Sequence, residues 1–191
     1  MASSSLRSVS PPPSLGDSRV APAVEAIAGW ANRHWLLCFN TLLSFYVLTT
    51  ALAPILSATG HQLLARPIYF YFHFLCHQDP DRSFHIAGHQ MAVCERCLAI
   101  YGALLVGGLV FALLRSRLAP LSPRGLLLFA LPMAVDGLTQ LAGLRESTWE
   151  LRLATGALFG FGVCWLVLPH LERGLAVREG QVVEHRGVRD A

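Results

Sequence analysis

Long runs of uncharged, apolar residues constrain the fold of this chain more than any other feature. At about 1.5 Å of rise per residue, a helix of about 20 residues crosses the hydrocarbon core of a membrane, which is about 30 Å thick. Three runs of about this length contain no charged residue, and a fourth is interrupted only by Asp136 and Gln140. The four runs are residues 35–57, 97–114, 125–144 and 153–171. The sequence therefore predicts an all-α integral membrane protein, a bundle of four membrane-spanning helices.

The composition agrees with a membrane as the solvent of this protein. Hydrophobic residues make up 53% of the 191 residues and charged residues only 14%, far from the balance of a soluble domain. The formal net charge is +3, and every basic residue is an arginine. Because so modest an excess of positive charge is no footprint of nucleic acid, we expect no nucleic-acid partner and take the lipid bilayer as the main partner of the chain.

The predicted spans divide the chain into three parts. Residues 1–23 are rich in serine, proline and alanine, and we expect a disordered tail because they cannot bury enough apolar surface to offset the entropy of ordering. Residues 24–171 form the predicted four-helix transmembrane domain. Residues 172–191 form a polar C-terminal tail.

The distribution of arginine predicts the orientation in the membrane. Cytoplasmic loops of membrane proteins carry an excess of Lys and Arg. Arginines stand before the first span, between the second and third spans, and after the fourth span. On the opposite side of the membrane, acidic residues partly offset the charge of the arginines. We therefore expect a multi-pass protein of the cell membrane, plasma or inner, with both termini in the cytoplasm. The arginines on this side are Arg19, Arg33, Arg115, Arg117, Arg124, Arg173 and Arg178.

The outer loop between the first two spans carries the most specific pattern in the chain. It holds Cys76 and the pair Cys94-Glu-Arg-Cys97, whose spacing is typical of a turn that aims two thiols at one tetrahedral ion. Residues 79–81 indicate a turn, and residues 84–93 indicate a short hairpin that would return Cys94 to Cys76. With one histidine, the thiols would complete a site for zinc, or for iron, since thiolate and imidazole suit both metals. Spacing alone does not choose the histidine among His73, His77, His85 and His89.

Two other interpretations of the cysteines stay open. A thiol pair at the start of a transmembrane helix is also similar to the quinone-coupled disulfide oxidoreductases, in which the helix dipole and Arg96 would favour a thiolate. Cys76 would then be the exchanging third thiol. Alternatively, Cys94 and Cys97 are idle thiols or form a structural disulfide. The other two cysteines lie alone in apolar runs and are expected to be small core residues; they are Cys38 and Cys164.

Asp136 is a second anomaly, because an ionisable group inside a membrane span is costly unless it is paired. It should face the interior of the bundle, and Gln140, one turn further on, shares its face. The direction of the span puts both residues in the outer half of the membrane, near the cysteines. Arg145 and Arg152 could pair with Asp136 or Glu146, or could hold an anionic headgroup. In the alternative interpretation, this is a helix-packing cluster in which an arginine or the Thr155 hydroxyl satisfies Asp136.

Several short motifs share this half of the chain. They are Cys76-His77-Gln78, Arg82-Ser83-Phe84, Cys94-x-Arg96-Cys97, Asp136-Gly137-x-Thr139-Gln140, Arg145-Glu146-Ser147 and Leu151-Arg152-x-x-Thr155-Gly156. Over residues 67–162 the chain thereby resembles the bacterial and archaeal membrane proteins grouped as domain of unknown function 2085. The resemblance implies a small multi-helix membrane protein and supplies no activity. It also favours His77 as the histidine of the site, and implies that the Asp136–Gln140 and Arg145–Arg152 elements belong to one site.

The leading hypothesis is an integral membrane protein with a structural metal site at the outer interface. The expected ligands are Cys76, His77, Cys94 and Cys97, and the expected metal is zinc, with iron as the alternative. A polar cavity beneath the loop would take a lipid headgroup, a quinone or a membrane-protein partner. Its expected residues are Gln78, Arg82, Ser83, Arg96, Asp136, Gln140, Arg145 and Arg152.

Two rival functions accompany this hypothesis. One is a membrane thiol–disulfide oxidoreductase that passes electrons from Cys76 and the Cys94/Cys97 pair to a quinone. The other is a non-catalytic accessory subunit of a larger membrane complex. In that case Gly156 and Gly160, whose small-xxx-small spacing lets helices approach closely, would form the contact.

Overall fold

The computed structural model describes residues 20–114 and 117–189. Residues 1–19 of the predicted N-terminal tail lie outside the described residues, and residues 20–23 already belong to a helix. The chain divides into two compact units, of which the first ends at Trp35. Its helix α1 (Val20–Arg33) is followed by His34, whose ring lies 5.0 Å from that of Trp30.

The second unit is helical except for the outer loop. Three helices are long and apolar enough to cross a membrane, over Trp35–Ala58, Glu95–Leu114 and Trp149–Ala176, so the prediction of a mostly helical membrane protein is confirmed. The remaining expected span, residues 125–144, largely coincides with a helix over Pro123–Leu141 that is less apolar, and the four-helix bundle stays a prediction. The elements are α2 (Trp35–Ala58), α3 (Gln62–His73), the 3-10 turn η1 (Pro80–Arg82), β1 (His85–Ile86), β2 (His89–Gln90), α4 (Glu95–Leu114), α5 (Pro123–Leu141) and α6 (Trp149–Arg189).

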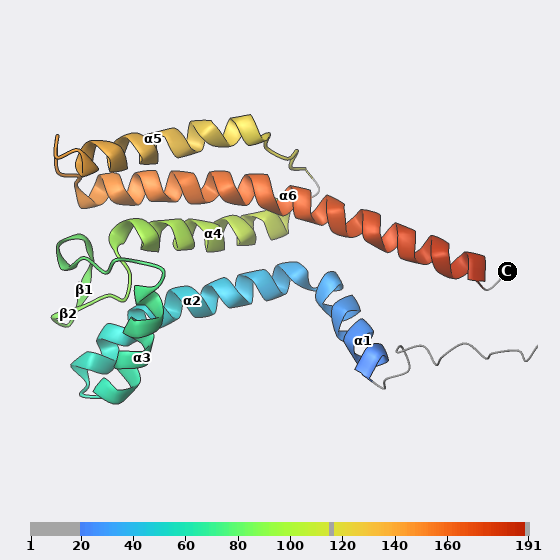
Figure 1. The fold of residues 1–191 in the computed structure, drawn as a ribbon, viewed down its shortest axis with the longest axis horizontal. Helices are drawn as coiled ribbons and strands as arrows, with labels where there is room; N and C mark the ends of the chain where they lie inside the picture. Colours follow the sequence, from blue (N-terminus) through green and yellow to red (C-terminus); the bar gives the residue numbers. More distant parts are fainter. Residues whose placement is uncertain (1–19, 115–116, 190–191) are drawn as a thin grey trace, which may run out of the picture. The chain divides into compact units, whose positions relative to one another are not determined.

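Helix α6 lies between α4 and α5 and packs along both (Figure 1). The two glycines of the small-xxx-small motif make the contact with α4. A Cβ atom on Gly156 would lie 2.7 Å from the carbonyl oxygen of Arg96, and one on Gly160 would lie 2.6 Å from that of Ile100. The two backbones can approach this closely only because both side chains are absent. This glycine face is therefore buried inside the chain, and the expectation that it contacts a partner subunit is wrong.

A proline in α2 positions the outer loop. Pro54 has no N–H, so the carbonyl oxygen of Thr50, four residues earlier, has no partner within the helix. The amide of Ala92 in the outer loop donates to this oxygen at 3.3 Å. The loop is thus joined to the helix at a buried core cluster, which consists of Ala53, Phe72, Cys76, Ala92 and Val93.

The short hairpin of the loop is antiparallel, with His85 opposite Gln90 and Ile86 opposite His89. Its two turn residues both have positive φ, 50° at Ala87 and 79° at Gly88. Two such residues give the turn a twist that matches the flanking strands. The chain therefore reverses within four residues and returns toward α4.

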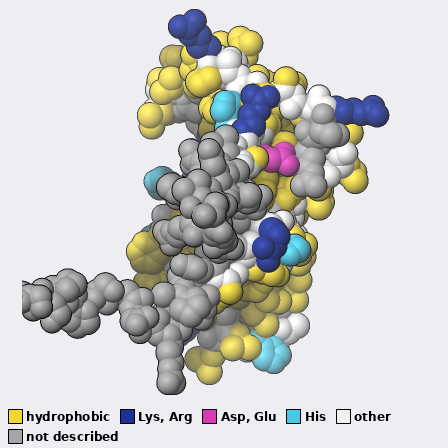
Figure 2. Space-filling view, turned by 90° about the vertical axis from the view of Figure 1, so that its right-hand side faces the viewer, with side chains coloured by type: hydrophobic (Ala, Val, Ile, Leu, Met, Phe, Trp, Pro, Cys, Tyr) yellow, Lys and Arg dark blue, Asp and Glu magenta, His cyan; other side chains and the backbone are white. Residues whose placement is uncertain are grey.

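Large apolar side chains are exposed along the helices. Leu113 is 83% exposed and Leu141 is 84% exposed, and hydrophobic side chains make up most of the described surface in view in Figure 2. Helix α3 is similar, with Leu63 85% exposed and Phe70 67% exposed. Contiguous apolar surface of this kind is unfavourable in water and favourable against lipid. At the other end of the chain, α6 continues through the predicted polar tail to Arg189.

Candidate metal centre and polar cavity

Three thiols converge where the outer loop meets α4. The sulfur atoms of Cys76, Cys94 and Cys97 all lie within 4.8 Å of one another. Cys76 follows α3, Cys94 directly precedes α4, and Cys97 lies in the first turn of α4. The hairpin between them closes the loop. Zinc–sulfur bonds of about 2.3 Å in a tetrahedron require sulfur–sulfur separations of about 3.8 Å, so small adjustments would place all three around one ion.

Hydrogen bonds hold the loop in this conformation. Gln78, with a φ of 51°, donates from its side-chain amide to the carbonyl oxygens of Tyr69 at 2.8 Å and Ala92 at 2.9 Å. Gln90 in turn donates to the carbonyl oxygen of Gln78 at 2.6 Å and to the Ser83 hydroxyl at 3.2 Å. Gln78 and Ser83, expected in the cavity, therefore brace the backbone around the thiols.

The thiols polarise one another. The backbone amide of Cys94 donates to the sulfur of Cys76 at 3.2 Å. Hydrogen bonds from the Cys94 and Cys97 thiols to the same sulfur lower the pKa of Cys76 to about 2. The same hydrogen bond to Cys76 raises the pKa of Cys94. These hydrogen bonds favour a thiolate at Cys76, and binding a divalent ion would displace the remaining protons of the group.

No histidine nitrogen in the described part of the chain belongs to this thiol group. His77, favoured by the resemblance, is exposed and lines the cavity that all three cysteines also line. The structure thus brings together three of the four predicted ligands.

The cavity has a volume of about 440 Å³ and lies between the loop and three helices. Arg96 comes from α4, Gln140 from α5 and Arg152 from α6. Arg82 comes from the loop. These four residues were expected here, whereas Asp136 and Arg145 are not in the cavity lining. The apolar part of the lining consists of Leu75, Ile100 and Met133.

Asp136 is almost fully buried and pairs with two arginines, of which Arg96 lines the cavity. It accepts a hydrogen bond from Arg96 and another from Arg145, the latter at 2.7 Å. The Thr155 hydroxyl instead donates to the carbonyl oxygen of Leu151 in its own helix. Of the partners considered from the sequence, arginine rather than threonine therefore satisfies the carboxylate.

Arg152 pairs with a residue that the sequence analysis had not assigned to the site. Its guanidinium lies 2.8 Å from the carboxylate of Glu95 and also donates to the carbonyl oxygen of Ser147 at 2.5 Å. Both side chains of the pair are about nine-tenths buried. The available signal was a carboxylate in the first turn of a membrane-spanning helix, which needs a cation nearby.

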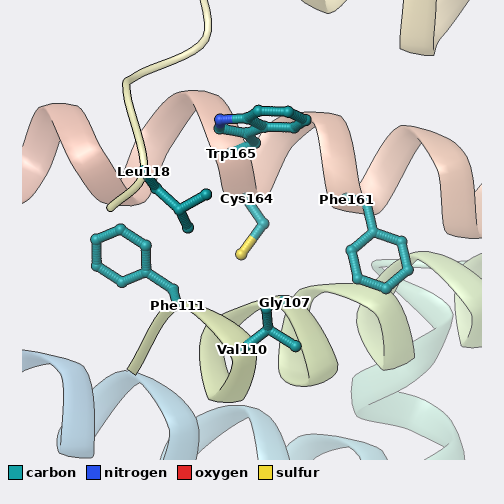
Figure 3. Close-up of a pocket in the computed structure, with 7 residues that line it drawn as sticks. All are labelled: Gly107, Val110, Phe111, Leu118, Phe161, Cys164 and Trp165. Atoms are coloured by element: carbon teal, nitrogen blue, oxygen red, sulfur yellow. The ribbon is translucent and has the colours of Figure 1, made fainter. Parts of the chain in front are cut away.

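A second cavity of about 210 Å³ lies between α4 and α6, and its lining is apolar (Figure 3). Cys164 points from α6 toward Gly107 of α4, where a Cβ atom would lie only 2.8 Å from its sulfur. Cys164 is buried, so it packs as the small core residue expected of it.

Comparison with known proteins identifies the family. Residues 76–166, which contain the thiols and all the ion pairs just described, match the family described as predicted membrane protein (DUF2085). An uncharacterized protein of Methanocaldococcus jannaschii is 40% identical over 145 residues, which cover 72% of this chain and 92% of that protein. The chain belongs to the DUF2085 family.

A second similar protein extends this comparison. An uncharacterized protein of Methanothermobacter thermautotrophicus is 38% identical over 102 residues, covering 52% of this chain and 92% of that protein. No solved structure matches the chain significantly. Membership of the DUF2085 family therefore establishes a membrane protein, and the chemistry of the site has to be argued from its residues.

Proposed function

We propose that this DUF2085 protein holds one metal ion, zinc, at the outer membrane interface through Cys76, Cys94 and Cys97. The observation that carries the proposal is the convergence of three sulfur atoms within 4.8 Å. Three thiolates are a donor set that zinc prefers, and the N–H donor on the Cys76 sulfur favours its ionised form. The partly buried hydrogen bonds of Gln78 to the loop backbone would keep the ligands in place, as hydrogen bonds around metal ligands do in other proteins.

The fourth ligand would come from the cavity. His77 lines it and is the predicted ligand. A closed set of four protein ligands is typical of a structural zinc site, whereas three protein ligands and an open position are typical of a site that takes a further molecule. The metal content of a His77→Ala variant distinguishes these cases, because a closed site needs the imidazole to bind zinc tightly.

The proposed topology has four spans, with α5 as the fourth, and both termini in the cytoplasm of the cell. Helix α5 has 19 residues, and exposed leucines such as Leu128 and Leu138 cover its outer face. The buried pairing of Asp136 with two arginines reduces the cost of a carboxylate at that depth. In this topology the thiols and the cavity lie on the outer side.

Elemental analysis of the detergent-purified full chain tests the metal site. The expected result is about one zinc per chain, with three of the five thiols masked until a chelator is added. Cys94→Ser and Cys97→Ser should each lose most of the zinc, while Cys38→Ser, on an exposed position of α2, should keep it. Equal zinc in all these variants would show that the metal binds elsewhere.

One observation favours a second candidate, a thiol–disulfide oxidoreductase. A stabilised thiolate at Cys76 beside two further thiols is also an arrangement for disulfide exchange. Oxidation of two thiols to a disulfide releases two electrons and two protons, which reduce a quinone to its quinol. This candidate requires a preparation without zinc, in which two thiols appear only after a reductant is added.

A further inference from the structure

Two stripes of exposed side chains run along helix α3. Leu63 and Phe70 are strongly exposed, and their spacing of about two helical turns puts them on one face, the apolar stripe. Arg66 and His73 have the same spacing, are also exposed, and share a second face, the polar stripe. The buried ring of Phe72 lies on a third face. The exposed surface of α3 is therefore divided lengthwise into an apolar and a polar part.

The direction of this division indicates how α3 lies in a membrane. Both kinds of side chain occur at both ends of the helix, with Gln62 beside Leu63 in the first turn and Phe70 near His73 in the last. The 12 residues of α3 extend about 18 Å, too short for a hydrocarbon core of about 30 Å. A helix that entered the membrane end-on would be polar at one end and apolar at the other. A lengthwise division is instead typical of a helix that lies flat between water and acyl chains.

The apolar stripe is continuous with the exposed apolar surface of α2. A groove of about 360 Å³ lies between the two helices, and its apolar lining includes Phe45 of α2 and Tyr71 of α3. Phe45 and Leu48 are exposed on α2, which is long and apolar enough to cross a membrane. Because the chain belongs to a family of membrane proteins, acyl chains are the expected solvent of this surface.

The end of α3 also fixes the first thiol of the site. The backbone amides of Leu75 and Cys76 both donate to the carbonyl oxygen of Phe72, at 3.0 Å and 2.9 Å. The ring of Phe72 in turn packs edge-on against Tyr46 of α2, with 4.8 Å between the ring centroids. The depth of α3 in the membrane therefore determines the depth of Cys76.

We propose that α3 is an interfacial helix that lies flat in the outer leaflet of the bilayer and holds the thiols at the level of the lipid headgroups. Leu63 and Phe70 enter the acyl-chain region. Arg66 and His73 face the headgroups and water, where the Arg66 guanidinium attracts lipid phosphate. The choice of leaflet rests on the proposed topology, whereas the contact with lipid does not depend on zinc.

Photo-crosslinking of the full chain in vesicles of dioleoylphosphatidylcholine tests the proposal. The photoreactive residue p-benzoylphenylalanine, which forms a covalent bond at nearby C–H groups, replaces one exposed side chain at a time. After irradiation, Phe70→p-benzoylphenylalanine should gain the mass of one lipid. His73→p-benzoylphenylalanine is the matched control in the same turn, on the polar stripe, and its lipid adduct should be several-fold weaker. Leu48→p-benzoylphenylalanine, on the spanning helix α2, is the positive control and should also gain a lipid.

Three outcomes would overturn the proposal. One is a lipid adduct at Leu48 without one at Phe70. Another is an equal yield at Phe70 and His73, because α3 would then not lie flat. The third is a covalent dimer at Phe70, because a second copy of the chain would then cover the apolar stripe. The reaction is run on zinc-loaded and on chelator-treated protein, so failure of the proposed metal site appears as a chain without zinc, and failure of this inference as a missing lipid adduct at Phe70.

Discussion

The ion pair between Glu95 and Arg152 connects the cysteine pair to α6, and Glu95→Gln should destabilise the protein strongly. The two charged groups lie 2.8 Å apart, and their side chains are 9% and 10% exposed. Removing one partner of a buried pair typically costs about 3–5 kcal/mol, because the other charge is left uncompensated. Arg152 keeps its hydrogen bond to Ser147, so the lower end, about 3 kcal/mol, is expected.

The assay is equilibrium unfolding in mixed micelles of increasing SDS fraction, followed by tryptophan fluorescence. Asp79→Asn is the matched control, because the Asp79–Arg82 pair is 36% and 47% exposed and should contribute less than about 1 kcal/mol. The double variant Glu95→Gln/Arg152→Gln should recover part of the loss, because no charge is then left unpaired. A free energy of unfolding for Glu95→Gln within 0.5 kcal/mol of the wild type, roughly the size of a neutral surface substitution, would refute the reasoning.

Three further predictions follow from the packing and the thiols. Gly160→Ala should lower the free energy of unfolding by about 1–3 kcal/mol in the same assay, because its Cβ would lie 2.6 Å from a backbone oxygen of α4. In Gly102→Ala, the new Cβ meets no atom within 4 Å, so this control should be neutral or stabilising. Pro54→Ala restores an N–H that competes with the Ala92 amide for the carbonyl oxygen of Thr50 in α2. Zinc competition with a chelator should therefore show weaker metal binding in this variant. Unchanged metal binding would contradict the role of Pro54. Because the pKa of Cys76 is lowered from 9.0 to about 2, the fold stabilises its thiolate. The stability of the metal-free protein should therefore fall as the pH is lowered from about 9, by up to about 1.4 kcal/mol per pH unit, and Cys76→Ser should lose this slope.

The helical membrane protein and the grouping of the cysteines could both be predicted from local sequence. An uncharged run such as residues 35–57 has few stable conformations other than a helix in lipid. The Cys94-x-x-Cys97 spacing restricts both thiols to one turn, and a hairpin signal in residues 84–93 supplied the means of bringing Cys76 back. The intramembrane carboxylate of Asp136 required a cation, and arginine was among its predicted partners.

The partner of Arg152 and the position of His77 depended on distances between segments far apart in the chain. Glu95 and Arg152 are 57 residues apart, and only the close contact of α4 with α6 at Gly156 brings them together. His77 adjoins Cys76 in sequence, yet Cys76 is buried whereas His77 is exposed. Adjacency along the chain does not determine the direction of a side chain in a loop of this kind.

The sequence by itself determined the membrane as the solvent, the mostly helical secondary structure and the grouping of three cysteines, because apolar run length and short-range spacing act within a few residues of one another. The tertiary structure decided which charged groups pair and that Gln78 and Ser83 brace the outer loop. It also decided that Gly156 and Gly160 pack against α4. It further decided that the three cysteines converge and line one cavity with Arg96 and Arg152. The ion pairs arise from the packing of α4, α5 and α6 around Asp136 and Glu95. There, a change of a few ångströms in the distance between helices would change which charged groups meet.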